Sequence, residues 1–285
     1  MSDPHMGMNM PRVIYNLGLF RLLAGNPYDS LFLYAKAVQL SSTDRMIETS
    51  LRRLERLSVV LKMLRGYMWA RNLLILGRAG KFRDTASLEQ VMNLATAKAE
   101  PISGPVVILA GGTIAEFRME QYYQRLVDGF GCFHGTVIGG GTTAGVSGLV
   151  GKIQAAYPDS IESIGYVPAR LPAETEIDPQ YRQVRATGGQ YFSALEALQY
   201  WSDIIASDIA PAQVKLIGIN GGKISAFEYR LALMLGASVG VIESTGREAA
   251  RLTKDPDWKD SKNLVRLEGE KKEIEAFLEL KPKGH

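Results

Sequence analysis

A glycine-rich segment between residues 135 and 151 contains the side chains best suited to bind a ligand. It reads Gly-Thr-Val-Ile-Gly-Gly-Gly-Thr-Thr-Ala-Gly-Val-Ser-Gly-Leu-Val-Gly. The glycines at 139 to 141 let a ligand approach the backbone, and Thr142, Thr143 and Ser147 can donate hydrogen bonds to anionic oxygens. A helix that begins near Val146 would direct its unpaired N–H groups at the same point. The segment therefore predicts a binding site for a nucleotide or another phosphorylated ligand.

The elements that must position this segment repeat one unit, which consists of a short apolar strand, a glycine-containing turn and an amphipathic helix. We place the strands at Val106–Ala110, Gly135–Gly139, Ile161–Tyr166, Val214–Ile219 and Ser238–Glu243, with a weaker one at Asn263–Leu267. Apolar strands that alternate with helices predict an α/β fold with a parallel sheet covered by helices on both faces. In such sheets ligands bind beyond the carboxyl ends of the strands.

The loops after these strands contain glycine, proline or a hydroxyl where the fold would place a ligand. They predict one shared pocket in which Tyr166 is the candidate to stack on a base, whereas the alternative interpretation is that the glycines serve only tight turns. The expected ligand-binding residues are Gly111, Gly112, Thr113, Gly140, Gly141, Thr142, Thr143, Gly145, Ser147, Tyr166, Asn220, Gly221, Gly222, Lys223, Glu228, Ser244, Gly246 and Arg247.

The part of the chain before the first strand predicts a mainly helical region, because apolar residues between 54 and 64 recur at three- and four-residue spacing. The segment 41–44 resembles a helix start, and Gly77 to Gly80 predicts a break before a further helix from about Thr85 to Ala99. We assign 7–103 to this helical region and 104–285 to the α/β domain. Residues 1–6 resemble a remnant of an expression vector, and we exclude them from the fold prediction.

The composition favours a soluble cytoplasmic protein without a metal site. The 285 residues are 46% hydrophobic, yet the longest apolar stretches fall short of the roughly 20 residues of a membrane span. One cysteine and three histidines leave little material for disulfides or for a Cys/His metal site. The net charge of +3 gives no strong signal for nucleic acid. Residues 1–100 are more basic, with 14 Lys and Arg against 8 Asp and Glu, which predicts either a solvated helix face or a surface for a partner or an anion.

Three segments between Pro105 and about Trp258 carry a resemblance to a known superfamily. They read Val-Val-Ile-Leu-Ala-Gly-Gly-Thr, Val-Ile-Gly-Gly-Gly-Thr-Thr-Ala-Gly-Val-Ser-Gly and Leu-Ile-Gly-Ile-Asn-Gly-Gly-Lys-Ile-Ser-Ala-Phe-Glu-Tyr. They resemble the SLOG superfamily, and more narrowly its LSDAT branch, the prokaryotic relatives of the N-terminal domain of melastatin-type TRP channels. The resemblance implies a Rossmann-like nucleotide-binding domain at 104–285 that senses ADP-ribose or a cyclic ADP-ribose derivative and requires no further cofactor. It also implies a bacterial signalling or antiphage defence system, a homo-oligomer, and a fused or separate effector.

The same superfamily contains the LOG phosphoribohydrolases, which cleave the N-glycosidic bond of nucleoside monophosphates and carry the signature Pro-Gly-Gly-x-Gly-Thr-x-x-Glu. Residues 220–228 keep the paired glycines, a hydroxyl and Glu228 but lack the proline and the third glycine. The arginine that these enzymes carry on the preceding helix has no counterpart between 195 and 213. An N-glycosidase that uses Glu228 is therefore the alternative function. The favoured interpretation is that Glu228 binds ribose hydroxyls or caps the 221–223 turn.

The long connection between Pro168 and Ser193 shows no clear regular structure in the sequence. Connections of this length are often lids or binding loops, and this one follows the third strand on the ligand side. The alternative is an insertion that packs against the helical region. Arg185 within it, together with Lys223 and Arg247, supplies the cations that could hold a substrate phosphate in place of the missing arginine.

Overall fold

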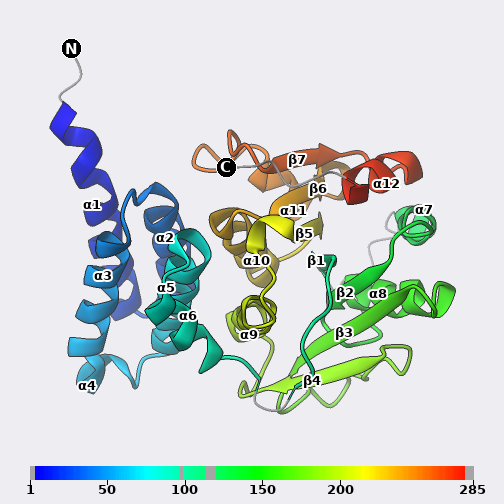
Figure 1. Ribbon diagram of the computed structural model, residues 1–285, viewed down its shortest axis with the longest axis horizontal. Helices are drawn as coiled ribbons and strands as arrows, with labels where there is room; N and C mark the ends of the chain where they lie inside the picture. The colour runs from blue at the N-terminus through cyan, green and yellow to red at the C-terminus, as the bar shows by residue number, and fades with distance from the viewer. Residues whose placement is uncertain (1–3, 97–98, 113–119, 280–285) are drawn as a thin grey trace.

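Seven parallel strands form one sheet in the computed structural model, which describes residues 4–96, 99–112 and 120–279 (Figure 1). The strand order is β4-β3-β2-β1-β5-β6-β7. The strands are β1 Val106–Gly111, β2 Gly135–Gly139, β3 Ile161–Pro168, β4 Gln183–Thr187, β5 Lys215–Ile219, β6 Ser238–Ile242 and β7 Leu264–Leu267. Because β2 and β5 flank the central β1, the chain leaves the sheet in opposite directions at this point, which is where α/β sheets bind ligands.

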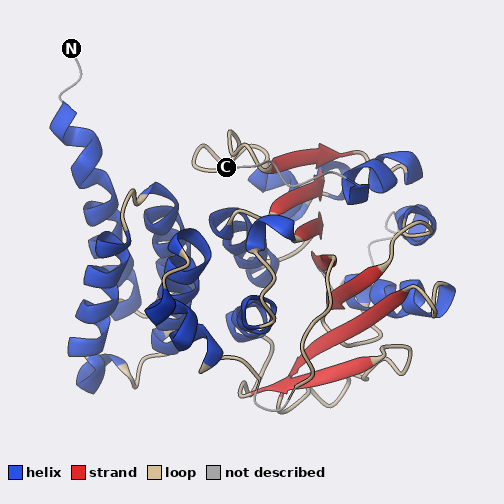
Figure 2. Cartoon of the chain, in the orientation of Figure 1, coloured by secondary structure: helices blue, strands red, loops and turns tan. Residues whose placement is uncertain are grey.

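The apolar strands are buried on both faces, as their sequences predict. Alternate residues of β1 enter different hydrophobic clusters: Ile108 and Ala110 belong to one, and Val107 and Leu109 to the other. Two helical layers cover these faces (Figure 2). On one face lie α7 Glu120–Gly129, α8 Gly145–Ala156 and α12 Lys271–Glu279, and on the other α9 Ala194–Ala206, α10 Lys223–Leu235 and α11 Arg247–Leu252. The expected fold, a Rossmann-like α/β sheet preceded by helices, is confirmed.

The N-terminal helices form a further layer outside α9 and α10 (Figure 1). They are α1 Pro4–Leu23, α2 Pro27–Leu40, α3 Asp44–Arg56, α4 Ser58–Leu61, α5 Tyr67–Phe82 and α6 Thr85–Met92. Helices α2 and α5 pack on α10, while α5 and α6 pack on α9. One hydrophobic cluster includes buried residues of both parts of the chain, such as Leu74 of α5 and Leu231 of α10. No helix in the described part of the chain is long and apolar enough to cross a membrane.

The predicted break at Gly77 to Gly80 is wrong, because α5 continues through it to Phe82. These glycines permit close packing between helices. A Cβ atom on Gly77 would lie 2.8 Å from Val38 Cγ1 of α2, and one on Gly80 would lie 2.7 Å from Leu235 Cδ2 of α10. The glycines therefore keep α5 close to its neighbours without ending it. The helix expected from Thr85 to Ala99 ends earlier, at Met92.

The connection between Pro168 and Ser193 is not irregular throughout, because it contains the edge strand β4. Residues 183–187 pair with β3 in parallel register, from Ile164 and Gln183 to Pro168 and Thr187. The segment Gln-Val-Arg-Ala-Thr lacks the apolar run of the central strands, since an edge strand is less covered than they are. That is why the sequence pattern did not indicate a strand here. The chain also begins α1 at Pro4, within the segment that we excluded from the prediction.

Candidate functional site

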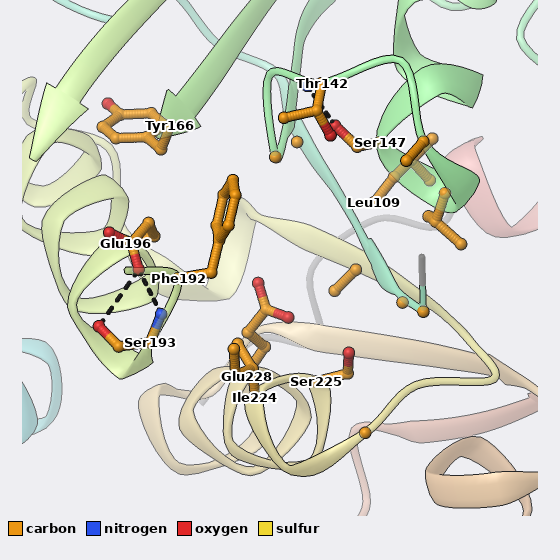
Figure 3. Close-up of a pocket in the computed structure, with 18 of the residues that line it drawn as sticks. Leu109, Thr142, Ser147, Tyr166, Phe192, Ser193, Glu196, Ile224, Ser225 and Glu228 are labelled. Carbon is orange, nitrogen blue, oxygen red and sulfur yellow. Dashed lines mark hydrogen bonds between the residues drawn. The ribbon is translucent and has the colours of Figure 1, made fainter. Parts of the chain in front are cut away.

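A cavity of about 840 Å³ lies at the carboxyl ends of β1, β2, β3 and β5 (Figure 3). Gly111, the last residue of β1, and Gly139, the last residue of β2, line it together with Gly112 and Gly140, which follow them. The cavity therefore lies at the point where the connections of the sheet diverge. Its volume is within the range of about 300–1,000 Å³ that is typical of small-molecule sites.

The first wall is the turn between β2 and α8. The backbone N–H of Thr142 donates to Ser147 Oγ over 2.8 Å, and the Tyr181 hydroxyl donates to the Ser147 carbonyl over 2.8 Å. The hydroxyls of Ser147 and Tyr181 are 3.3 Å apart. The Tyr181 hydroxyl already donates its proton to the Ser147 carbonyl. The Ser147 hydroxyl can therefore donate its own proton to the Tyr181 oxygen or to an anion. The turn thus presents a hydroxyl and a helix N-terminus to the cavity.

The second wall is the N-terminus of α10, where the N-cap Gly222 is followed by Lys223 and Ser225. The first-turn amides of a helix lack intrahelical acceptors and carry a partial positive charge. Lys223 and Arg247, both exposed, line the same side, and neither forms an ion pair within the residues that the structure describes. This end of the cavity is suited to a phosphate or diphosphate.

Acidic and aromatic side chains line the opposite part of the cavity. The Glu228 carboxylate points from α10 towards the ring of Phe192 (Figure 3) and accepts a hydrogen bond of 3.3 Å from the Tyr200 hydroxyl. Burial raises the pKa of Glu228 to about 7. The hydrogen bond from Tyr200 lowers this pKa, and the nearby charge of Glu196 raises it by a smaller amount. Glu228 therefore changes protonation near neutral pH, as residues that act in acid–base chemistry often do.

Glu196 is the second carboxylate of this region and is buried at the start of α9. It accepts hydrogen bonds from the Thr187 hydroxyl over 2.6 Å and from the Ser193 backbone N–H over 2.8 Å. Ser193 and Glu196 form a reciprocal capping box. Burial raises the pKa of Glu196, although these hydrogen bonds oppose the shift. Glu196 therefore holds α9 to the end of β4, in addition to lining the cavity.

The N-terminal helices also contribute to the cavity through Tyr28, the second residue of α2. Its ring packs against Trp69 of α5, with the ring centroids 5.6 Å apart. Burial raises the pKa of Tyr28 to about 12, while Arg65 lowers it and Glu196 and Glu228 raise it. Tyr28, Glu196 and Glu228 line the same cavity. A ligand in the cavity would therefore contact both the sheet domain and the helical region.

The structure brings ten of the expected ligand-binding residues to the cavity. These are Gly111, Gly112, Gly140, Thr142, Ser147, Tyr166, Gly222, Lys223, Glu228 and Arg247. Thr113 lies outside the described residues. The other expected residues do not line the cavity: Gly141, Thr143, Gly145, Asn220, Gly221, Ser244 and Gly246.

Several residues in this last group shape the turns instead. Gly141 has a φ of +72°, and a Cβ atom there would lie 2.8 Å from Val167 Cγ1. Asn220 is buried, donates through Nδ2 to the Thr245 carbonyl over 2.9 Å, and accepts the Gly221 N–H over 2.7 Å. These residues fix the walls of the cavity without facing it. The conformation of the turns therefore explains why glycine stands at 141 and asparagine at 220.

Tyr166 lines the cavity but is only 1% exposed. Its hydroxyl donates to Asp203 Oδ2 over 2.6 Å, and its ring packs edge-on against Tyr200. The ring of Phe192 projects into the cavity between Tyr166 and Glu228 (Figure 3). Phe192 therefore offers a base a better stacking surface than Tyr166 does.

Arg185 does not line the cavity, and it is only 6% exposed. Its guanidinium forms an ion pair of 3.0 Å with Asp203 and donates to the Glu100 carbonyl over 2.7 Å. Arg185 therefore does not replace the arginine of the LOG enzymes that this chain lacks. Its guanidinium is already paired with the buried carboxylate of Asp203. Of the three cations considered from the sequence, only Lys223 and Arg247 face the cavity.

Among the lining residues outside the expected set are Tyr28, Phe192 and Glu196. The spacing Ser193-x-x-Glu196 is a capping-box signal that could have placed Glu196 at a helix start beyond a strand. No local pattern indicates Tyr28, because only the packing of α2 against α10 brings it there. The connection after β3 does contribute to the site, through Pro172, Glu174 and Thr175.

In the described part of the chain, no group of three or more His, Cys, Asp or Glu side chains could hold a metal ion.

No protein-family model matches the chain, and no curated protein matches it. Among solved structures, the chain is similar to a molybdenum cofactor carrier protein from Chlamydomonas reinhardtii, with 20% sequence identity and a TM-score of 0.43. The similarity covers 60% of this chain and 94% of that one. The fold described above follows from the strand order of this chain itself.

Proposed function

We propose that this chain is a sensor of a nucleotide derivative of the ADP-ribose type. The observation that carries the proposal is the polarised cavity at the switch point between β1 and β5. Helix N-termini and two cations line one end, while aromatic rings and carboxylates line the other. A diphosphate would bind the first end, and ribose hydroxyls and a base would bind the second. The resemblance to the LSDAT branch supports the same ligand class and a role in bacterial signalling or defence.

Tyr28 supplies the route by which the helical region would respond to the ligand. It joins the cavity to α2, and through Trp69 to α5. Gly66 lies next to this contact, since a Cβ atom there would be 2.5 Å from Pro27 Cβ. A ligand that touches Tyr28 changes the environment of two helices at once. We therefore infer that α2 and α5 transmit occupancy to an effector, fused or separate.

Calorimetry with ADP-ribose, cyclic ADP-ribose isomers, NAD and AMP tests the proposal. We expect at least one of them to bind with a Kd below about 1 mM, which corresponds to a binding free energy beyond about −4 kcal/mol. Failure of all four compounds to bind would leave the sensor hypothesis without its ligand class.

A substitution that fills the cavity tests whether the ligand binds there. Gly222 has an extended backbone, and a Cβ atom on it would have only Arg247 Nη2 nearby, at 3.7 Å. Gly222→Leu should therefore fold normally and weaken binding at least about tenfold, the equivalent of about 1.4 kcal/mol. Gly188→Leu is the matched control, because Gly188 has no neighbour within 4 Å of an added Cβ and does not line the cavity. Equal losses in the two variants would argue against this site.

A nucleotide N-glycosidase is the second candidate, favoured by the position of Glu228. A carboxylate in an apolar cavity can stabilise positive charge on a ribose or activate water. The assay is the release of free base from nucleoside monophosphates. Glu228→Gln should lower the rate at least about a hundredfold. Because the ionised carboxylate would act, the wild-type rate should rise with pH and level off above about 7, the pKa of Glu228. Binding without base release from any common nucleotide would exclude the enzyme and leave the sensor.

A further inference from the structure

A second cavity, of about 430 Å³, lies within the helical region between α1 and α3. Three arginines line it: Arg12 from α1, and Arg45 and Arg53 from α3. The remaining lining residues are Tyr15, Asn16, Thr43, Met46, Thr49 and Ser50. None of the lining residues that the structure describes is a carboxylate, so these side chains carry a formal charge of +3.

The acidic residues of the two helices do not neutralise these arginines. Helix α1 contains no Asp or Glu, and α3 contains three. Each of the three is paired with an arginine outside the cavity: Asp44 with Arg78 over 3.6 Å, Glu48 with Arg52 over 2.6 Å, and Glu55 with Arg71 over 3.6 Å. The charge of the cavity is therefore left uncompensated by the elements that form it.

Most of the donors in the cavity are also free to bind a ligand. Arg53 donates one N–H to Asn16 Oδ1, while Arg12 and Arg45 make no side-chain hydrogen bond within the described residues. Thr43 is the N-cap of α3, yet its hydroxyl makes no capping bond. A guanidinium group binds phosphate oxygens through two parallel N–H donors and stays charged at every physiological pH. Three such groups and a free hydroxyl around one cavity match a compound with several phosphate oxygens.

We propose that this cavity is a second anion site, which binds a small phosphorylated compound of the diphosphate or polyphosphate type. The ligand would bridge Arg12 of α1 to Arg45 and Arg53 of α3, and so hold the two helices together. The site is independent of the cavity at the sheet and does not rest on the nucleotide proposed for it.

Titration of the full chain with inorganic pyrophosphate at low ionic strength tests the site, with hydrogen exchange as the localising measurement. We expect slower exchange in residues 10–23 and 43–56. Protection confined to the sheet cavity, in residues 139–148 and 222–226, or no binding at all, would overturn the proposal. Inorganic phosphate serves as the weaker comparison, because it offers fewer oxygens to three guanidinium groups.

Charge-removing variants separate the site from a general effect of basic charge. Arg12→Gln and Arg45→Gln alter exposed side chains and should fold normally. Each should weaken pyrophosphate binding about tenfold, since each removes a charge-assisted pair of donors. Arg56→Gln is the control: Arg56 is exposed on the same helix, lies outside the cavity and makes no ion pair in the described part. An equal loss in Arg56→Gln, or unchanged binding in the other two variants, would show that the three arginines form no site.

Discussion

At the scale of single residues, Glu228 lies in an environment that differs from that of an exposed carboxylate. The LOG-like signature singled it out, and the structure explains how it could act. It faces an apolar part of the cavity, and only the Tyr200 hydroxyl donates to it among the described residues. Burial favours the neutral form, which raises its pKa to about 7. Protonation of Glu228 is therefore linked to folding as well as to any chemistry.

Glu228→Gln should change how stability depends on pH. The carboxyl group of the unfolded chain loses its proton near pH 4.5, whereas that of the folded chain keeps it up to about 7. Glu228 thus stabilises the fold below pH 4.5, and this contribution is lost as pH rises through about 7. The loss is at most about 3 kcal/mol. Urea denaturation at pH 4.5, 6 and 8 should show the variant gaining stability relative to wild type as pH rises.

The control for this experiment is Glu174→Gln, which removes an exposed carboxylate from the rim of the same cavity. Its stability should run parallel to that of wild type across the three pH values. Glu196 remains in every protein and contributes a change of the same sign, because burial raises its pKa too. A Glu228→Gln curve parallel to wild type would contradict the assignment.

At the scale of elements, a buried polar network joins three parts of the fold behind the cavity. Asp203 of α9 accepts hydrogen bonds from Tyr166 of β3, from Arg185 of β4 and from Thr96, which follows α6. Asp203 and Arg185 are 4% and 6% exposed, so their ion pair is shielded from water. The edge strand β4, which has a weak apolar pattern, is thereby fixed to α9 and to the end of the helical region.

Asp203→Asn should destabilise the protein by about 3–5 kcal/mol, because it leaves the buried guanidinium of Arg185 without its counter-charge. Asp208→Asn provides the comparison. Asp208 follows the same helix and pairs with Arg83 over 3.4 Å, but its side chain is 96% exposed, so the change should cost less than about 1 kcal/mol. Chemical denaturation of both variants measures the difference. Similar losses in the two would mean that the network does not depend on the charge of Asp203.

At the scale of the whole molecule, the helical region is part of the candidate site as well as a separate layer. Tyr28 of α2 faces the same cavity as residues of α9 and α10, and one hydrophobic cluster extends through both regions. A ligand in this cavity would therefore contact Tyr28, which is about 80 residues away from β1 along the chain. The proposed sensor role requires such a contact between the two regions.

Hydrogen exchange can test this connection between the regions. A bound ADP-ribose-type nucleotide should slow exchange in the first turns of α2 and α5, which carry Tyr28 and Trp69. Tyr28→Ala should remove that protection and weaken binding about tenfold, the equivalent of an aromatic contact of about 1.4 kcal/mol. Tyr191→Ala alters a 68% exposed ring outside the cavity and should change neither the protection from exchange nor the affinity for the nucleotide. Unchanged protection in Tyr28→Ala would show that Tyr28 does not transmit occupancy.

The sequence by itself determined the parallel sheet and the edge of it at which the cavity lies. Apolar runs such as Val106–Ala110 can be buried only in a sheet covered on both faces, and glycine-rich turns mark their carboxyl ends. Local patterns were not sufficient for β4, because an edge strand needs no continuous apolar run. They also misplaced a break in α5, where the glycines make room for neighbouring helices.

Only the tertiary structure decided which residues of each turn face the cavity. Gly140 faces it, whereas Gly141 packs against β3, although the two are adjacent and identical in type. Packing of distant elements also brought Tyr28 and Phe192 to the site and kept Arg185 away from it. The physical reason is the same in each case. Local sequence sets the conformation of a turn, but the direction of a side chain depends on what packs against it.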